Sequence, residues 1–278
     1  MALAAALCVG VLPAAVAAAA GGAAHTKLVA LHDPGATMGD QFGHGVAISA
    51  SGSIALVGAY DTSSGAGAAY VYKAGKTGWS TSPIKTFTDP GHGVDHFGFS
   101  VALSPDGTTA YVAADRLAVG ARTGAGAVFV YHASKGIWPS TPTQTINDPG
   151  TASGDAFGVS IAVSPDGKTV AVGAPVTTVG GTAQAGEAYV YQASSGKLPT
   201  TPTASIPDPN PSLGRGFFGY TLSLSDVTVG KGILVSGAYV TTVKGQSAAG
   251  AAYIYQEKSA HLWVLAKGGQ LTDPGDVG

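Results

Sequence analysis

The dominant pattern along the chain is a strict alternation of large and small side chains in short segments that open with Phe-Gly. Residues 97–103 read Phe-Gly-Phe-Ser-Val-Ala-Leu, and residues 157–163 read Phe-Gly-Val-Ser-Ile-Ala-Val. A period of two predicts a β-strand that begins at the Phe-Gly. Because the smaller residues are glycine, serine and alanine rather than charged residues, we expect both faces of each sheet to be covered by other sheets.

These segments belong to a repeat in which three markers keep the same order. Phe-Gly stands at residues 42, 97, 157 and 218, Gly-x-Ala/Val-aromatic-Val/Ile-Tyr begins at Gly67, Gly126, Gly186 and Gly250, and Asp-Pro begins at Asp33, Asp89, Asp148, Asp208 and Asp273. Turn sequences such as Ser-Pro-Asp-Gly at 104–107 and 164–167 separate the strands. We interpret each unit as four short strands, with repeats at about 33–88, 89–147, 148–207 and 208–272.

Composition narrows the fold class. The chain has 278 residues, of which 42 are glycine and only 11% are charged, while 45% are hydrophobic. So many glycines oppose long helices, and the hydrophobic content opposes disorder. We therefore predict an all-β protein, a β-propeller of four-stranded antiparallel blades stacked around an axis. The net charge of −2 and the absence of a basic cluster argue against a nucleic-acid partner.

Unit three shows the motifs most completely. It carries Gly-Asp-Ala-Phe-Gly at 154–158, Gly-Ala-Pro at 173–175 and Gly-Glu-Ala-Tyr-Val-Tyr at 186–191. This order resembles the FG-GAP repeat, which builds the seven-bladed head of integrin α chains and occurs in many secreted bacterial proteins. The resemblance covers residues 33–255 and implies four complete blades, but it carries little information about function.

The strand count indicates a partial propeller. Residues 27–31, which lead to Asp33-Pro34, match the fourth strand of a unit, yet unit four has its own candidate in residues 262–272. One strand is therefore surplus to a closed four-bladed ring, as in a truncated member of a six- or seven-bladed lineage. We expect the open blade faces of such an arc to cause self-association or poor solubility.

The N-terminal segment has the pattern of a signal peptide. Residues 1–24 carry no charge and end in alanine and glycine, which predicts a cleaved segment at 1–24 and a mature propeller at 25–278. An uncleaved membrane anchor is the alternative, because the apolar run is long enough to span. With cleavage no membrane span remains, and Cys8, the only cysteine, is removed. We expect a secreted, extracellular or cell-surface protein.

The chain offers few candidate metal ligands. The resemblance implies that some blades bind calcium through an Asp-x-Asp-x-Asp-Gly loop, and calcium takes six to eight oxygen ligands. Here each such loop supplies one carboxylate, Asp106 or Asp166, so we interpret both as turn residues and predict no metal site. His92 and His96 flank Asp95 and have ligand chemistry, but a third protein ligand is not evident.

A second set of carboxylates precedes the Phe-Gly. Asp40, Asp95 and Asp155 occupy this position in three units. They could form a ring around the axis, or each could accept hydrogen bonds from nearby backbone in an Asx-type turn. Gly216 interrupts the series in unit four. We favour the turn interpretation.

No sequence feature indicates catalysis. The chain lacks a Gly-x-Ser-x-Gly elbow, a P-loop and a dinucleotide fingerprint, so we assign no catalytic and no cofactor-binding residues and expect no cofactor. Trp79 and Trp138 precede the fourth strand, with Leu198 at that place in unit three; sugar stacking is possible there, but their recurrence favours packing between blades.

These observations favour a non-catalytic extracellular binding, adhesion or structural module. Its partner would be an unknown extracellular protein or glycan held by loops at one end of the propeller. The alternative is the propeller region of a larger secreted enzyme, such as a hydrolase, with a site in the channel or on an attached domain.

Overall fold

The computed structural model describes residues 29–91, 93–193, 197–225, 227 and 231–274. Its strands form four antiparallel sheets, and the helical segments are α1 (Thr62–Gly65) and the 3-10 turn η1 (Pro211–Leu213). The predicted all-β architecture of four-stranded blades is therefore confirmed, and the described part forms a partial propeller. In this part of the chain no helix is long and apolar enough to cross a membrane.

Each blade draws its strands from one repeat. Blade 1 contains β1 (Val46–Ile48), β2 (Ile54–Ala59), β3 (Ala68–Gly75) and β5 (Lys85–Thr88), and β4 (Gly78–Trp79) also pairs with β3. Blade 2 contains β6 (Phe97–Leu103), β7 (Thr109–Ala114), β8 (Ala127–His132) and β9 (Gln144–Asn147). Blade 3 contains β10 (Ser160–Val163), β11 (Thr169–Ala174), β12 (Glu187–Gln192) and β13 (Ala204–Pro207). Blade 4 contains β14 (Thr221–Leu224), β15 (Ile233–Ala238), β16 (Ala251–Ser259) and β17 (Leu262–Thr272).

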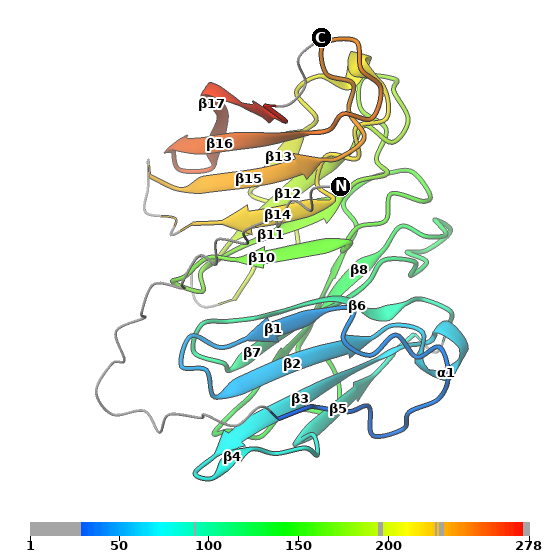
Figure 1. Cartoon of the computed structure of the whole chain (residues 1–278), viewed down its shortest axis with the longest axis vertical. Helices are drawn as coiled ribbons and strands as arrows, with labels where there is room; N and C mark the ends of the chain where they lie inside the picture. The colour runs from blue at the N-terminus through cyan, green and yellow to red at the C-terminus, as the bar shows by residue number, and fades with distance from the viewer. Residues whose placement is uncertain (1–28, 92, 194–196, 226, 228–230, 275–278) are drawn as a thin grey trace, which may run out of the picture.

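The blades follow one another in an arc rather than a closed ring. The first strand of each blade is the inner strand, because β1 contacts β6, β6 contacts β10, and β10 contacts β14. Among the described residues no comparable contact joins β14 back to β1. In Figure 1 the chain accordingly passes from blade 1 at the bottom to blade 4 at the top.

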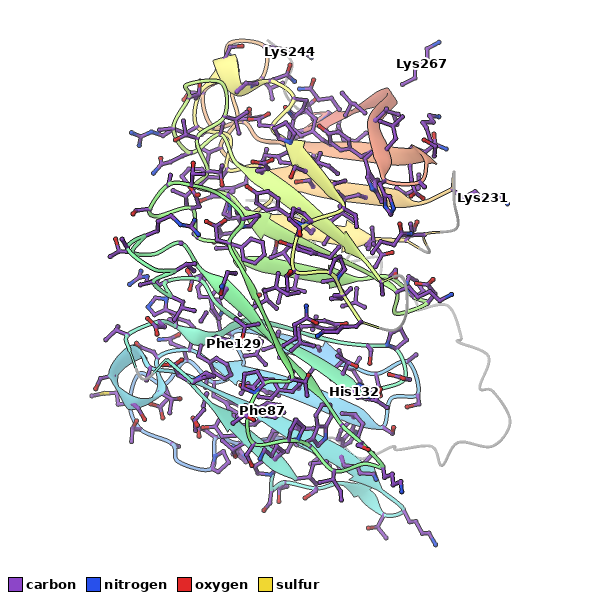
Figure 2. The ribbon with its side chains drawn as sticks, turned by 180° about the vertical axis from the view of Figure 1, so that it is seen from behind. Phe87, Phe129, His132, Lys231, Lys244 and Lys267 are labelled. Atoms are coloured by element: carbon purple, nitrogen blue, oxygen red, sulfur yellow. The ribbon has the colours of Figure 1, made fainter. Side chains whose placement is uncertain are left out.

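The hydrophobic core is divided into layers between the blades. Leu56, Val71 and Phe87 of blade 1 pack with Phe97 and Phe129 of blade 2, and equivalent clusters join blades 2 and 3 and blades 3 and 4. Figure 2 labels Phe87 and Phe129, which both belong to this layer. Both faces of blades 2 and 3 are therefore covered, which explains why the small face of their Phe-Gly segments carries no charges.

The repeated glycines allow each blade to approach its neighbour at backbone distance. The Phe157 N–H donates to the carbonyl of Ala125 at 2.9 Å, and a Cβ on Gly126 would overlap the Phe157 carbonyl oxygen. Gly126 also has a φ of +92°, which favours glycine. The same contacts join blades 1 and 2 through Ala66 and Gly67, and blades 3 and 4 through Ala185 and Gly186. We call the blade face with Phe-Gly its leading face and the face that receives the next blade its trailing face.

The first strands differ from the expectation in one respect. Only β6 begins at its Phe-Gly, whereas β1, β10 and β14 begin three or four residues later. The residue before the phenylalanine and the glycine after it both have positive φ, as at His96 (58°) and Gly98 (93°). This turn, together with a register shift between Phe97 and Val101, breaks the predicted alternation, so that Phe99 leaves the inter-blade core and faces the axis.

Candidate functional site

A cavity of about 590 Å³ lies at the inner ends of blades 2, 3 and 4. We call it the axial pocket. Its wall combines aromatic rings, a cation and a buried acid, contributed by His96, Phe99, Asp115, Arg116, Phe217 and Tyr220. These residues lie in the loop before each inner strand, on the inner strand itself, or directly after the second strand of blade 2. A smaller cavity of about 360 Å³, lined in part by Tyr111, His132 and Lys168, lies between blades 2 and 3.

The polar part of the axial pocket is a His–Asp pair. His96 Nδ1 lies 3.3 Å from Asp115 Oδ1, and both residues are buried. Burial raises the pKa of Asp115 to about 7, although the charge of Arg116 opposes the rise. Burial, with a smaller contribution from Arg116, lowers the pKa of His96. Near neutral pH the pocket therefore holds a neutral imidazole beside a carboxyl group that exchanges its proton in this range.

Aromatic side chains share the rest of the wall with small and aliphatic residues, and the aromatic rings continue beyond it. The Phe99 ring lies 4.5 Å from the His44 ring and 5.3 Å from the Tyr60 ring, measured between centroids. On blade 4 the Tyr220 and Tyr239 rings lie 4.6 Å apart and are 41% and 53% exposed. Exposed rings that already contact one another offer flat apolar surface at small entropic cost.

The predicted histidine cluster is only partly described. His92 lies outside the described residues. His96 is brought to Asp115, from the end of the second strand, rather than into a site with Asp95. No group of three or more metal-ligating side chains occurs in the described residues. His96 is therefore a wall residue of the axial pocket.

Asp106 and Asp166 lie in the turns between the first and second strands. Asp106 Oδ1 accepts hydrogen bonds from Ser104 Oγ at 2.5 Å and from the Thr108 N–H at 3.0 Å. Asp166 accepts the equivalent bonds from Ser164 Oγ at 2.6 Å and from the Lys168 N–H at 3.0 Å. These carboxylates close the turns with their own neighbours, as expected of turn residues.

The aspartates before Phe-Gly sit beside those of the Asp-Pro motif. Asp40 accepts hydrogen bonds from Thr37 N–H at 2.7 Å and Thr37 Oγ1 at 2.5 Å, which hold its pKa below the usual range. Burial and the nearby Asp148 raise the pKa of Asp155 to about 6. Asp148 also forms an ion pair with Arg122. These carboxylates order the loops that carry the Phe-Gly.

The tryptophan position of the repeat lies in the core. Trp138 is 8% exposed and packs edge-on against Phe87 of the preceding blade at 5.8 Å between ring centroids. Leu198 joins the cluster between blades 2 and 3, and Trp79 packs against the core on the leading face of blade 1. Packing, rather than sugar stacking, accounts for their recurrence.

Comparison with protein families adds to this geometry. A model described as FG-GAP repeat matches residues 25–72 and 141–191. The chain carries FG-GAP repeats. The matched stretches end at Tyr72 of blade 1 and Tyr191 of blade 3. Their glycines contact the backbone of the next blade, which explains why the FG-GAP motif has glycine at these positions. A search of curated proteins finds no match.

Sequence reasoning did not find the axial pocket. It placed Phe99 on the same strand face as Phe97 and did not connect Asp115 and Arg116 with His96, because these residues meet only when the blade folds. One signal was available in the sequence. Asp115 stands where unit three has Pro175, so blade 2 carries an acid at a position that the motif fills with proline.

Proposed function

We propose that the chain is a non-catalytic extracellular binding module that holds a protein or glycan ligand in the axial pocket. FG-GAP repeats are typical of extracellular proteins, and a propeller presents the loops of several blades at one end. The single observation that carries the proposal is the wall of the pocket, where aromatic rings, among them the exposed ring of Tyr220, line the same cavity as a buried polar pair and a cation.

The pocket chemistry indicates the class of ligand. Tyr220 and Tyr239 offer flat apolar surface. Arg116 forms no salt bridge with a described residue, so its guanidinium is available to an anionic group. The ligand that fits is a sugar ring or an aromatic or apolar peptide side chain that carries a carboxylate or another anion close by.

A binding screen tests this proposal. The protein would be probed with acidic and neutral oligosaccharides and with peptides that end in an acidic residue, and binders would be measured by calorimetry. We expect Arg116→Ala and Tyr220→Ala each to weaken binding at least tenfold, while Ile137→Ala, at a residue 75% exposed outside the pocket, leaves it unchanged. Equal binding by the pocket variants, or no binder in either panel, would contradict the proposal.

A hydrolase is the second candidate, and the His96–Asp115 pair is the observation that favours it. A carboxyl group with a pKa of about 7 in a cavity can exchange a proton with a bound molecule near neutral pH. The test is release of a chromophore from glycoside and ester substrates between pH 5 and pH 8. Turnover by the native chain that is lost in Asp115→Asn would replace the binding proposal with the enzymatic one.

A further inference from the structure

The trailing face of blade 4 repeats a surface that is covered in the other blades. By strand register Val235, Ile254 and Leu271 of blade 4 correspond to Ala171, Val190 and Ile206 of blade 3. The three blade 3 residues are at most 3% exposed because blade 4 lies against them. Leu271, by contrast, is 50% exposed, and Val235 and Ile254 are only half-buried.

The backbone of this face also has the form that receives a Phe-Gly. Gly250 has a φ of +80°, compared with +95° at Gly186, which contacts Phe218 of the next blade. Ala248 has a φ of 58°, compared with 60° at Gln184, whose carbonyl accepts a hydrogen bond from the Phe217 N–H. Around Gly250 the nearest atoms all belong to Tyr239 of its own blade. Blade 4 thus carries a preformed acceptor surface, and no Phe-Gly of the described residues lies in it.

The leading face of blade 1 is the matching half. Gln41 has a φ of 56° and Gly43 a φ of 93°, the values that position the Phe-Gly of the later blades. Val46 and Ile48 point outward and are 68% and 62% exposed. Their equivalents in blade 2, Val101 and Leu103, are 8% and 7% exposed because blade 1 covers them.

A short segment already covers the outer part of this leading face. Leu31, like Phe42, packs against the cluster that contains Tyr70 and Tyr72, and the Tyr72 hydroxyl donates to the His32 carbonyl at 2.9 Å. Between blades 3 and 4 the same bond runs from the Tyr255 hydroxyl to the Pro207 carbonyl, at 3.5 Å. Residues 31 and 32 therefore occupy the place that the outer strand of a preceding blade takes elsewhere in the molecule.

We propose that the trailing face of blade 4 binds the leading face of blade 1 in a second copy of the chain. The two faces are the halves of a joint that this protein forms three times between its own blades. Both faces are made of uncharged residues, namely Val46 and Ile48 on the leading face and Val235, Ile254 and Leu271 on the trailing face. On docking, Leu271 of one copy takes the place of Leu31 on the leading face of the other copy, and Val46 and Ile48 of that face become covered. Such a head-to-tail contact is heterologous, and two copies provide eight blades, within the range of closed propellers.

Sedimentation of paired variants tests the inference, using the full chain expressed in a host that can process its N-terminal segment. Val46→Asp places a charge on the leading face alone, and Ile254→Asp does so on the trailing face alone. We expect the native chain to form dimers, and each variant to associate at least a hundredfold more weakly. Mixing the two variants restores a 1:1 dimer, because the intact trailing face of Val46→Asp can bind the intact leading face of Ile254→Asp. Ile137→Asp, outside both faces, is the matched control and leaves association unchanged.

The possible outcomes distinguish the closed head-to-tail dimer from a monomer, a symmetric dimer and longer assemblies. A native chain that stays monomeric at high concentration overturns the inference, and so does a Val46→Asp variant that dimerises as well as the native chain, which would indicate a symmetric contact. Growth beyond the dimer supports the joint but overturns the closed ring of eight blades. Far-UV circular dichroism of each variant establishes that loss of association is not loss of folding. Because none of these mutations lies in the axial pocket, ligand binding by a monomeric variant keeps the proposed function separate from this result.

Discussion

Substitution of Gly126 by alanine tests whether the joints between blades hold the fold together. Gly126 lies on the trailing face of blade 2, where a Cβ would overlap the Phe157 carbonyl oxygen, a backbone atom that no rotamer change can move. Gly250 occupies the same position on blade 4, with a similar φ, but its Cβ would meet only its own blade, at 2.9 Å from the Tyr239 oxygen. Gly250→Ala is therefore the matched control.

The expected magnitude follows from the contacts at each site. Both variants place alanine at a positive φ, which costs about 1–2 kcal/mol. Gly126→Ala also pushes blades 2 and 3 apart, which weakens the bonds from Phe157 N–H to Ala125 and from Ala156 N–H to Gly124, at 2.9 and 3.2 Å. Each such bond contributes about 1 kcal/mol. We expect Gly126→Ala to lower the free energy of unfolding by about 3–4 kcal/mol and Gly250→Ala by about 1–2 kcal/mol.

Urea denaturation followed by circular dichroism measures the difference, at a protein concentration where the native chain is monomeric. Amide hydrogen exchange should show the extra loss of protection in β8, β9 and β10, on the two sides of the weakened joint. Equal destabilisation by the two substitutions would refute the reasoning, because it would mean that the approach of the Phe-Gly backbone adds nothing to stability.

Three further predictions concern the whole chain. The pKa of Asp115 rises from 3.8 to about 7 on folding, so the folded form binds the extra proton and the free energy of unfolding falls as the pH rises from 4 to 7. Asp115→Asn should remove up to about 4 kcal/mol of this pH dependence. Urea titrations at several pH values would contradict the prediction if the free energy of unfolding changed with pH equally in the variant and the native chain. Excess chelator should leave the melting temperature unchanged, because Asp106 and Asp166 are satisfied within their turns, whereas a drop of many degrees would restore the metal interpretation. The far-UV spectrum should be dominated by β structure, and a third of the residues in helix would be incompatible with the described fold.

The fold was predictable because its local and global patterns agree. Alternating side chains, turn sequences such as 104–107 and recurring Gly-x-Ala-Tyr-x-Tyr strands each specify a strand or a turn without reference to the rest of the chain. The part that failed was the start of the first strand in blades 1, 3 and 4. Gln41, Ala156 and Phe217 adopt positive φ there, and a residue that is not glycine gives no sign of this in the sequence.

The candidate site was harder to predict from the sequence than the fold, for a physical reason. His96 and Asp115 are separated by a complete hairpin, and the distance between them depends on how the two strands close. The sequence placed His96 with its neighbour Asp95, because local spacing was the only geometry available. The alternation placed Phe99 on the same strand face as Phe97, and the turn at Gly98 changes that placement.

The glycine contacts between blades have a consequence for how this architecture can grow. Each joint is formed by backbone contacts at glycines and by a layer of hydrophobic strand side chains, so the surface that one blade presents to the next depends little on which residues fill the loops. A duplicated repeat of about 60 residues would therefore fit between any two neighbours without new complementary surfaces, since it brings both halves of the joint with it. Blade number and loop sequence can change independently, and the arc can be lengthened while its ligand-facing loops diverge.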